Sequence, residues 1–208
     1  MSLKINSRCA QCRRAGEKLM LKGEKCLGPK CPFVKRNYPP GMHGPDQKRA
    51  KLSGYGKQLK EKQKVKRVYG LIERQFANLV EEAQVKVGDT SKILVNLLES
   101  RLDNVVYRCA FGKNRMNARQ LVSHGLITVN GKKVDVPSFR VKAGMVVAIK
   151  PEAKSKKAFE NFTERLTKAE YPSWISVDPV AFSAKILNAP SLDNPNFSSQ
   201  SIIEFYSR

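Results

Sequence analysis

Acidic residues are scarce in this chain: 18 Asp and Glu stand against 39 Lys and Arg among 208 residues, which gives a formal net charge of +21. Long apolar runs are also missing, because no stretch approaches the roughly 18 residues of a membrane span and the first residues lack the apolar segment of a signal peptide. Such an excess of cations argues against an ordinary soluble enzyme. We expect a protein that stays in the cytosol and binds no membrane, while 41% hydrophobic residues still support real cores.

Histidine is also scarce, because the chain has only two, His43 and His124. Neither has a neighbouring Cys-Asp or Ser-Asp arrangement of the kind that supports nucleophilic catalysis. The pattern predicts that the protein is not an enzyme and takes no small-molecule substrate.

The positive charge is concentrated in the first third of the chain. Residues 1–70 hold 19 Lys and Arg against four Asp and Glu, so this third supplies +15 of the +21. Cations at this density repel one another and need a polyanion, which in the cytosol is more often nucleic acid than a membrane surface. The alternative is a solubilising surface, but such surfaces normally mix both signs.

Four of the five cysteines lie within residues 1–36, a segment with too few apolar residues to build a core. They form two close pairs, Cys9 with Cys12 and Cys26 with Cys31. Four thiolates suit a structural zinc ion, which would supply the missing folding energy, and the same set can hold an iron–sulfur cluster. Four unrelated free thiols or two disulfides are the other interpretations, although cytosolic thiols stay reduced.

Hydrophobic periodicity predicts helices through the middle of the chain. One helical run covers residues 53–86, and Gly70 divides it in two. A second run follows an N-cap at Thr90 or Ser91, ends near Gly112 and carries the fifth cysteine, Cys109, on its apolar face, where we expect a core residue. A short third helix is predicted over residues 115–124, with Asn114 as its N-cap and Gly125 as its C-cap.

Beyond Gly125 the hydrophobic period becomes two, which predicts strands. Asn130-Gly131 lies between two such runs and indicates a type I′ hairpin turn, in which both central residues have positive φ. Further strand-like sequence follows at residues 139–141 and 145–149. Prolines then interrupt the C-terminal stretch, and its apolar end, residues 201–206, is expected to dock on a domain.

A basic stripe is predicted on the helix that follows Ser53, and its members are Lys57, Lys60, Lys64 and Arg67. Their three- and four-residue spacing places them on one face, where they can follow RNA phosphates. Tyr55 and Tyr69 flank the stripe and are candidates for stacking on sugars or bases, although tyrosines at helix ends more often pack. Arg74 is a further candidate RNA contact.

A second basic set begins at the short third helix, with Lys113, Arg115 and Arg119. Lys132 and Lys133 follow the hairpin turn. We expect the helix start and the hairpin to grip one RNA backbone together. A single residue of this set is also compatible with a simple solvated face.

Several stretches resemble the bacterial small-subunit ribosomal protein S-four family. The family's RNA-binding domain is matched by RLDNVVYR at residues 101–108 and by residues 118–138, which run from Ala-Arg-Gln-Leu-Val to Val-Pro-Ser. Outside that domain the matching stretches are YPPGMHG at residues 38–44, residues 55–65 and EFYSR at residues 204–208. The resemblance therefore spans nearly the whole chain, and the four cysteines match the family's metal-bearing variant.

The resemblance implies an α+β fold in three parts. A basic four-cysteine segment ending in a Pro/Gly turn would occupy residues 1–44. A helical domain would combine residues 45–95 with 186–208. An RNA-binding domain of helices and a small, mostly antiparallel sheet would be inserted at residues 96–185.

The function that the resemblance implies is structural. Family members bind small-subunit ribosomal RNA early in assembly, nucleate the body of the subunit and contact neighbouring small-subunit proteins near the messenger entry path, where decoding accuracy is set. Some also repress their own messenger RNA. The implied location is the cytoplasm, in the small ribosomal subunit.

Two other functions are compatible with parts of the sequence. Pseudouridine synthases use the same RNA-binding module and an Arg-Leu-Asp motif, which residues 101–103 mimic, but no large catalytic domain remains in this chain. A metal-dependent nucleic-acid-binding regulator outside the ribosome is the other alternative.

Overall fold

The computed structural model describes residues 7–45, 52–153, 159, 162–192 and 195–207. The chain divides into two compact units, Met1–Asn78 with Asn196–Arg208 and Leu79–Pro195. The three-part division implied by the resemblance stays a prediction. Within the described residues, no helix is long and apolar enough to cross a membrane.

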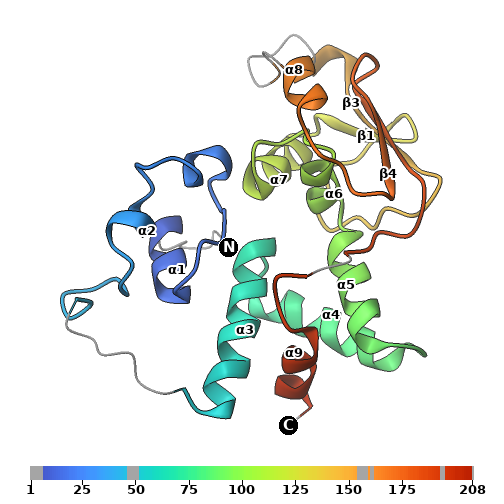
Figure 1. Ribbon diagram of the computed structural model, residues 1–208. Helices are drawn as coiled ribbons and strands as arrows, with labels where there is room; N and C mark the ends of the chain where they lie inside the picture. The colour runs from blue at the N-terminus through green and yellow to red at the C-terminus, as the bar shows by residue number, and fades with distance from the viewer. Residues whose placement is uncertain (1–6, 46–51, 154–158, 160–161, 193–194, 208) are drawn as a thin grey trace. The chain divides into compact units, whose positions relative to one another are not determined.

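The first unit is helical (Figure 1). Its elements are α1 (Arg8–Ala15), the 3₁₀ helix η1 (Gly23–Cys26), α2 (Pro32–Lys35), α3 (Gly54–Tyr69), the start of α4 (Glu73–Val85) and α9 (Ser199–Tyr206). The Ser53 hydroxyl caps α3 by accepting the Gly56 N–H, and Gly70 ends the helix at a φ of 65°. The predicted division of this helical run at Gly70 is confirmed.

The C-terminal helix α9 packs on α3 within this unit, and the two ribbons lie side by side (Figure 1). Phe205 stacks against Tyr55 with ring centroids 5.4 Å apart, and the ammonium of Lys62 lies 4.4 Å from the Phe205 ring. Ile202 is fully buried. The prediction that the apolar end docks on a domain is confirmed.

A carboxylate at the start of α4 ties these helices together. Glu73 accepts hydrogen bonds from Lys62 Nζ at 2.6 Å, Lys66 Nζ at 2.7 Å and the Tyr206 hydroxyl at 2.7 Å. Burial alone would raise the pKa of Glu73, but these three donors outweigh it and lower the pKa to about 2. The carboxylate is therefore ionised across the physiological range and holds α3, α4 and α9 at one point.

The second unit combines helices with a five-stranded antiparallel sheet in the order β2-β1-β3-β5-β4. Its helices are the end of α4, α5 (Thr90–Glu99), α6 (Leu102–Arg108), α7 (Arg115–Ser123), the 3₁₀ helix η2 (Pro151–Ala153) and α8 (Phe162–Thr167). Its strands are β1 (Ile127–Val129), β2 (Lys132–Lys133), β3 (Val146–Ile149), β4 (Ile175–Asp178) and β5 (Ser183–Ile186). Helices plus a small antiparallel sheet confirm the α+β class.

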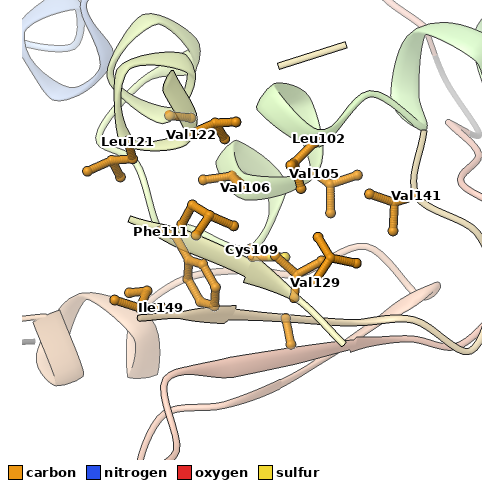
Figure 2. Packing of buried hydrophobic residues seen from close by; sticks show 14 of the residues in the cluster. Leu102, Val105, Val106, Cys109, Phe111, Leu121, Val122, Val129, Val141 and Ile149 are labelled. Carbon is orange, nitrogen blue, oxygen red and sulfur yellow. The ribbon is translucent and has the colours of Figure 1, made fainter. Parts of the chain in front are cut away.

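One face of this sheet forms the core with α6 and α7. The register pairs Ile127 with Ile149 and Ile175 with Ile186, which places all four buried side chains on the same face. Figure 2 shows the α6 and α7 side chains pointing toward those of β1 and β3. Cys109 is fully buried in this cluster, and burial raises the pKa of its thiol, so the prediction of a core residue is confirmed.

The hairpin prediction is confirmed by its backbone. Asn130 and Gly131 both have positive φ, 48° and 78°, as a type I′ turn requires. The third predicted helix is also present, since the Asn114 side chain accepts the Asn117 N–H at 2.9 Å and Gly125 adopts a φ of 64°.

The second helical run was predicted in the wrong form, because it is two helices rather than one. Its N-cap is Asp89, whose carboxylate accepts the N–H of Ser91, rather than Thr90 or Ser91. The break falls at Ser100, whose carbonyl accepts the Val141 N–H at 2.8 Å. Residues 139–141 therefore form no strand, and Arg140 makes an isolated β-bridge with Arg101 next to the break. The second of the two helices, α6, ends at Arg108 rather than near Gly112.

Candidate nucleic-acid interface

The basic stripe of α3 faces the N-terminal helix α1 along part of its length. Lys64 pairs with Glu17 at 3.0 Å and is 14% exposed, and Lys60 lies beside Gly16. Lys57 and Lys60 remain exposed. Part of the face that was predicted to follow RNA phosphates therefore contacts other residues of the first unit instead.

Arg67 ends the stripe next to a second guanidinium. Burial lowers the pKa of Arg67, and the neighbouring charge of Arg14 lowers it further. Among the residues that the structure describes, no carboxylate forms an ion pair with either guanidinium. Two guanidinium groups held close together without a carboxylate attract a polyanion.

The aromatic candidates differ in their availability. Tyr69 is 5% exposed, so its ring offers no face to a base in this structure. Tyr55 is 51% exposed even though it stacks on Phe205. Arg74 is exposed in the first turn of α4.

The second basic set lies at both ends of α7. Lys113 is exposed just before the helix, and Arg115 is its first residue. At the far end the side chain of Lys133 runs across Gly125, where an added Cβ would lie 2.2 Å from Lys133 Cε. A nine-residue helix spans about 14 Å, so helix start and hairpin can follow one RNA backbone only at separate phosphates.

Arg119 lies one turn beyond Arg115 and faces an acidic group. Its Nη1 is 3.7 Å from Asp103 Oδ2, and both oxygens of this carboxylate also accept hydrogen bonds from Arg101. Asp103 is 4% exposed. A buried aspartate held by arginines is poorly placed as a nucleophile, which argues against the pseudouridine synthase alternative. The sequence predicted that the Arg-Leu-Asp motif at residues 101–103 lies inside a helix, whereas Arg101 is the N-cap of α6.

A buried polar network supports this surface, and the sequence reasoning missed it. Glu99 is 0% exposed and accepts hydrogen bonds from Arg108 Nε at 2.8 Å and Nη2 at 3.0 Å. Asn104 donates from Nδ2 to the Glu99 carboxylate at 2.9 Å, and its Oδ1 accepts the Arg115 Nε–H at 2.9 Å. Polar residues at four-residue spacing in RLDNVVYR were the available signal, since they share a helix face.

The four N-terminal cysteines are gathered in the first unit, and Cys12, Cys26 and Cys31 are buried. The Leu19 N–H hydrogen-bonds the Cys12 sulfur, and the Lys22 N–H donates to Cys26 Sγ at 3.3 Å. Burial raises the pKa of the Cys12 thiol, and the three other thiols raise it further. Within the described residues, however, no three or more Cys, His, Asp or Glu side chains are arranged to hold a metal ion.

Comparisons with known proteins cover nearly the whole chain. Residues 4–99 match the model of the ribosomal protein S4/S9 N-terminal domain, and residues 100–147 match that of the S4 domain. The small ribosomal subunit protein uS4 of Thermoanaerobacter sp. (strain X514) is 48% identical over 202 residues, 96% of each chain. The chain belongs to the uS4 family. The uS4 of Thermus thermophilus is 47% identical over 203 residues, 96% of each chain, and that of Nitrosospira multiformis is 45% identical over both full lengths.

The boundary between the two family matches coincides with a structural feature. It falls between Glu99 and Ser100, where α5 ends and the backbone turns to bridge Arg140. The S4 domain match therefore begins at the helix break and contains α6, α7, the hairpin and the first half of β3. Every member of the second basic set lies inside it.

Proposed function

We propose that this chain is a structural constituent of the small ribosomal subunit that binds small-subunit ribosomal RNA directly. The observation that carries the proposal is 45–48% identity to uS4 proteins over 96% or more of both chains. The net charge of +21 and the neighbouring guanidinium groups of Arg14 and Arg67 support it, because both favour a polyanion. Catalysis has no part in this role, and neither a membrane nor a small-molecule substrate is needed.

The finer parts of the proposal follow the family. The protein would nucleate assembly of the subunit body, contact neighbouring small-subunit proteins in the cytoplasm and help to set accuracy near the messenger entry path. Repression of its own messenger RNA would use the same RNA-binding surface. Cosedimentation of the chain with small ribosomal subunits separates this role from that of a regulator outside the ribosome.

The affinity of the intact chain for small-subunit ribosomal RNA is expected to fall steeply with salt, because binding displaces counterions from phosphates. Lys57→Gln should lower the slope of log K against log salt by roughly 0.7–0.9, the value of one phosphate contact. Lys92→Gln is the matched control, since this 87% exposed lysine lies outside both basic sets. A salt-insensitive affinity, or equal slopes for wild type and Lys57→Gln, would contradict phosphate tracking by the stripe.

We also propose that Cys9, Cys12, Cys26 and Cys31 hold one structural metal centre, either zinc or an iron–sulfur cluster. Their placement in one unit, the burial of three of them and the N–H donors to two of the sulfurs fit thiolate ligands, although the sulfurs would have to draw together to bind. A bound ion would supply folding energy to a segment whose buried apolar cluster is small. Arg8 and Arg13, which lie beside Cys9 and Cys12 in sequence, would offset the negative charge of the thiolates.

Elemental analysis of anaerobically purified protein should find about one zinc per chain or, for the cluster, several irons with sulfide. Cys12→Ser should remove the metal, whereas Cys109→Ser should leave it bound, because Cys109 lies in the core of the other unit. Wild-type protein that is free of metal while its N-terminal segment resists proteolysis would rule out the centre.

A further inference from the structure

We propose that Asn104 and Tyr107 are positioning residues that order the Arg115 guanidinium before RNA arrives. The inference rests on the proposed RNA-binding function. It concerns a relay that starts at the buried Glu99 carboxylate and ends at a half-buried arginine on the first turn of α7.

The relay has a direction because an amide has two different ends. Asn104 is 2% exposed, and its Nδ2 donates to the Glu99 carboxylate at 2.9 Å and to the Glu99 carbonyl at 3.2 Å. A flipped amide would turn its oxygen toward that carboxylate and its NH2 toward a guanidinium, and both encounters are repulsive. The Asn104 oxygen is therefore fixed toward Arg115, whose Nε lies 2.9 Å away.

The base of the relay is itself held. Arg108 donates twice to Glu99, through Nε at 2.8 Å and Nη2 at 3.0 Å, so the carboxylate cannot rotate without breaking a two-bond pair. The buried Glu99 carboxylate therefore restricts the Asn104 amide, which in turn restricts the half-buried Arg115 side chain.

Tyr107 constrains the same guanidinium from another side. It lies three residues after Asn104 on α6, on a neighbouring part of the helix surface, and the Arg115 Cζ is 4.5 Å from its ring centroid. The hydrogen bond at Nε and the aromatic ring beside Cζ together restrict where the guanidinium can lie. A free arginine loses much rotamer freedom on binding, and a side chain ordered in advance avoids that loss.

The test measures binding of the full-length protein to small-subunit ribosomal RNA transcribed in vitro. Tyr107→Leu, which removes the ring, should weaken binding about tenfold, equivalent to about 1.4 kcal/mol. Tyr107→Phe keeps the ring face and should bind like wild type. Because Arg115 is still present in Tyr107→Leu, the salt slope should stay unchanged, whereas Arg115→Gln should lower the slope by roughly 0.7–0.9 as well as the affinity.

A double-mutant cycle decides whether Tyr107 acts through Arg115. In the Arg115→Gln background, Tyr107→Leu should cause no further loss. The same tenfold loss in both backgrounds would mean that Tyr107 contacts RNA itself, and no loss in the wild-type background would mean that Arg115 needs no ordering. Either result overturns the proposal, while failure of the wild type to bind this RNA would instead overturn the proposed function. Tyr107→Gln repeats the comparison if the leucine variant does not fold.

Discussion

Replacing Glu99 with alanine is expected to lower the free energy of unfolding of the second unit by about 3–5 kcal/mol. The carboxylate is fully buried, and its loss leaves the Arg108 guanidinium and the Asn104 amide without the acceptor that they share. Trp174 is the chain's single tryptophan and lies buried in this unit, so its fluorescence during urea unfolding reports the loss directly.

Two controls separate a buried charge from charge in general. Glu152→Ala removes an exposed partner of Lys150 and should cost under about 0.5 kcal/mol. The double variant Glu99→Met with Arg108→Met should be less destabilised than Glu99→Ala, because it removes both charges and refills the space. Equal losses for Glu99→Ala and Glu152→Ala would show that the network contributes no more than a surface ion pair.

Removing Arg115 and Arg119 together, by Arg115→Gln with Arg119→Gln, is expected to cost roughly 2 kcal/mol or more in binding to small-subunit ribosomal RNA. Both lie on the first two turns of α7, where organised charge-assisted hydrogen bonds to phosphate exceed loose surface charge. Filter binding at fixed salt gives the affinity, and Trp174 fluorescence confirms that the variant folds.

The control pair is Lys168→Gln with Lys185→Gln, two exposed lysines of the same unit that lie outside α7 and the hairpin. This pair should cost under about 1 kcal/mol. The sequence offers another loose set, Lys154, Lys156 and Lys157, which follow the last predicted strand and are predicted to contribute little individually, but they lie outside the described residues. Equal losses for the two pairs would mean that the chain binds by bulk charge, and the interface at α7 would have to be given up.

Local signals predicted local structure well. Asn130-Gly131 and Gly70 were predictable because positive φ strongly favours glycine or asparagine, so the residue type and the backbone geometry coincide. Asn114 was predictable as a cap because a side-chain acceptor before an apolar run satisfies free helix N–H groups.

Features that depend on distant partners were not predictable. Strands β4 and β5 were missed because the prolines around them suggested irregular structure, while the pairing of β5 with β3 is long-range in sequence. The candidate site shows the same limit. The charge pattern indicated Lys64 and Arg67 as surface cations. Residues far away in sequence restrict both, because Glu17 forms an ion pair with Lys64 and Arg14 lies near Arg67.

The docking of α9 on α3 has a consequence for synthesis of the protein. Gln58 Nε2 donates to Glu204 across 146 positions of sequence, so α3 emerges from the translating ribosome long before its partner helix exists. The second unit is continuous from Leu79 to Pro195 and can fold as soon as it has emerged. The first unit must wait for α9, and until then the basic N-terminal third exposes the face of α3 that α9 later covers.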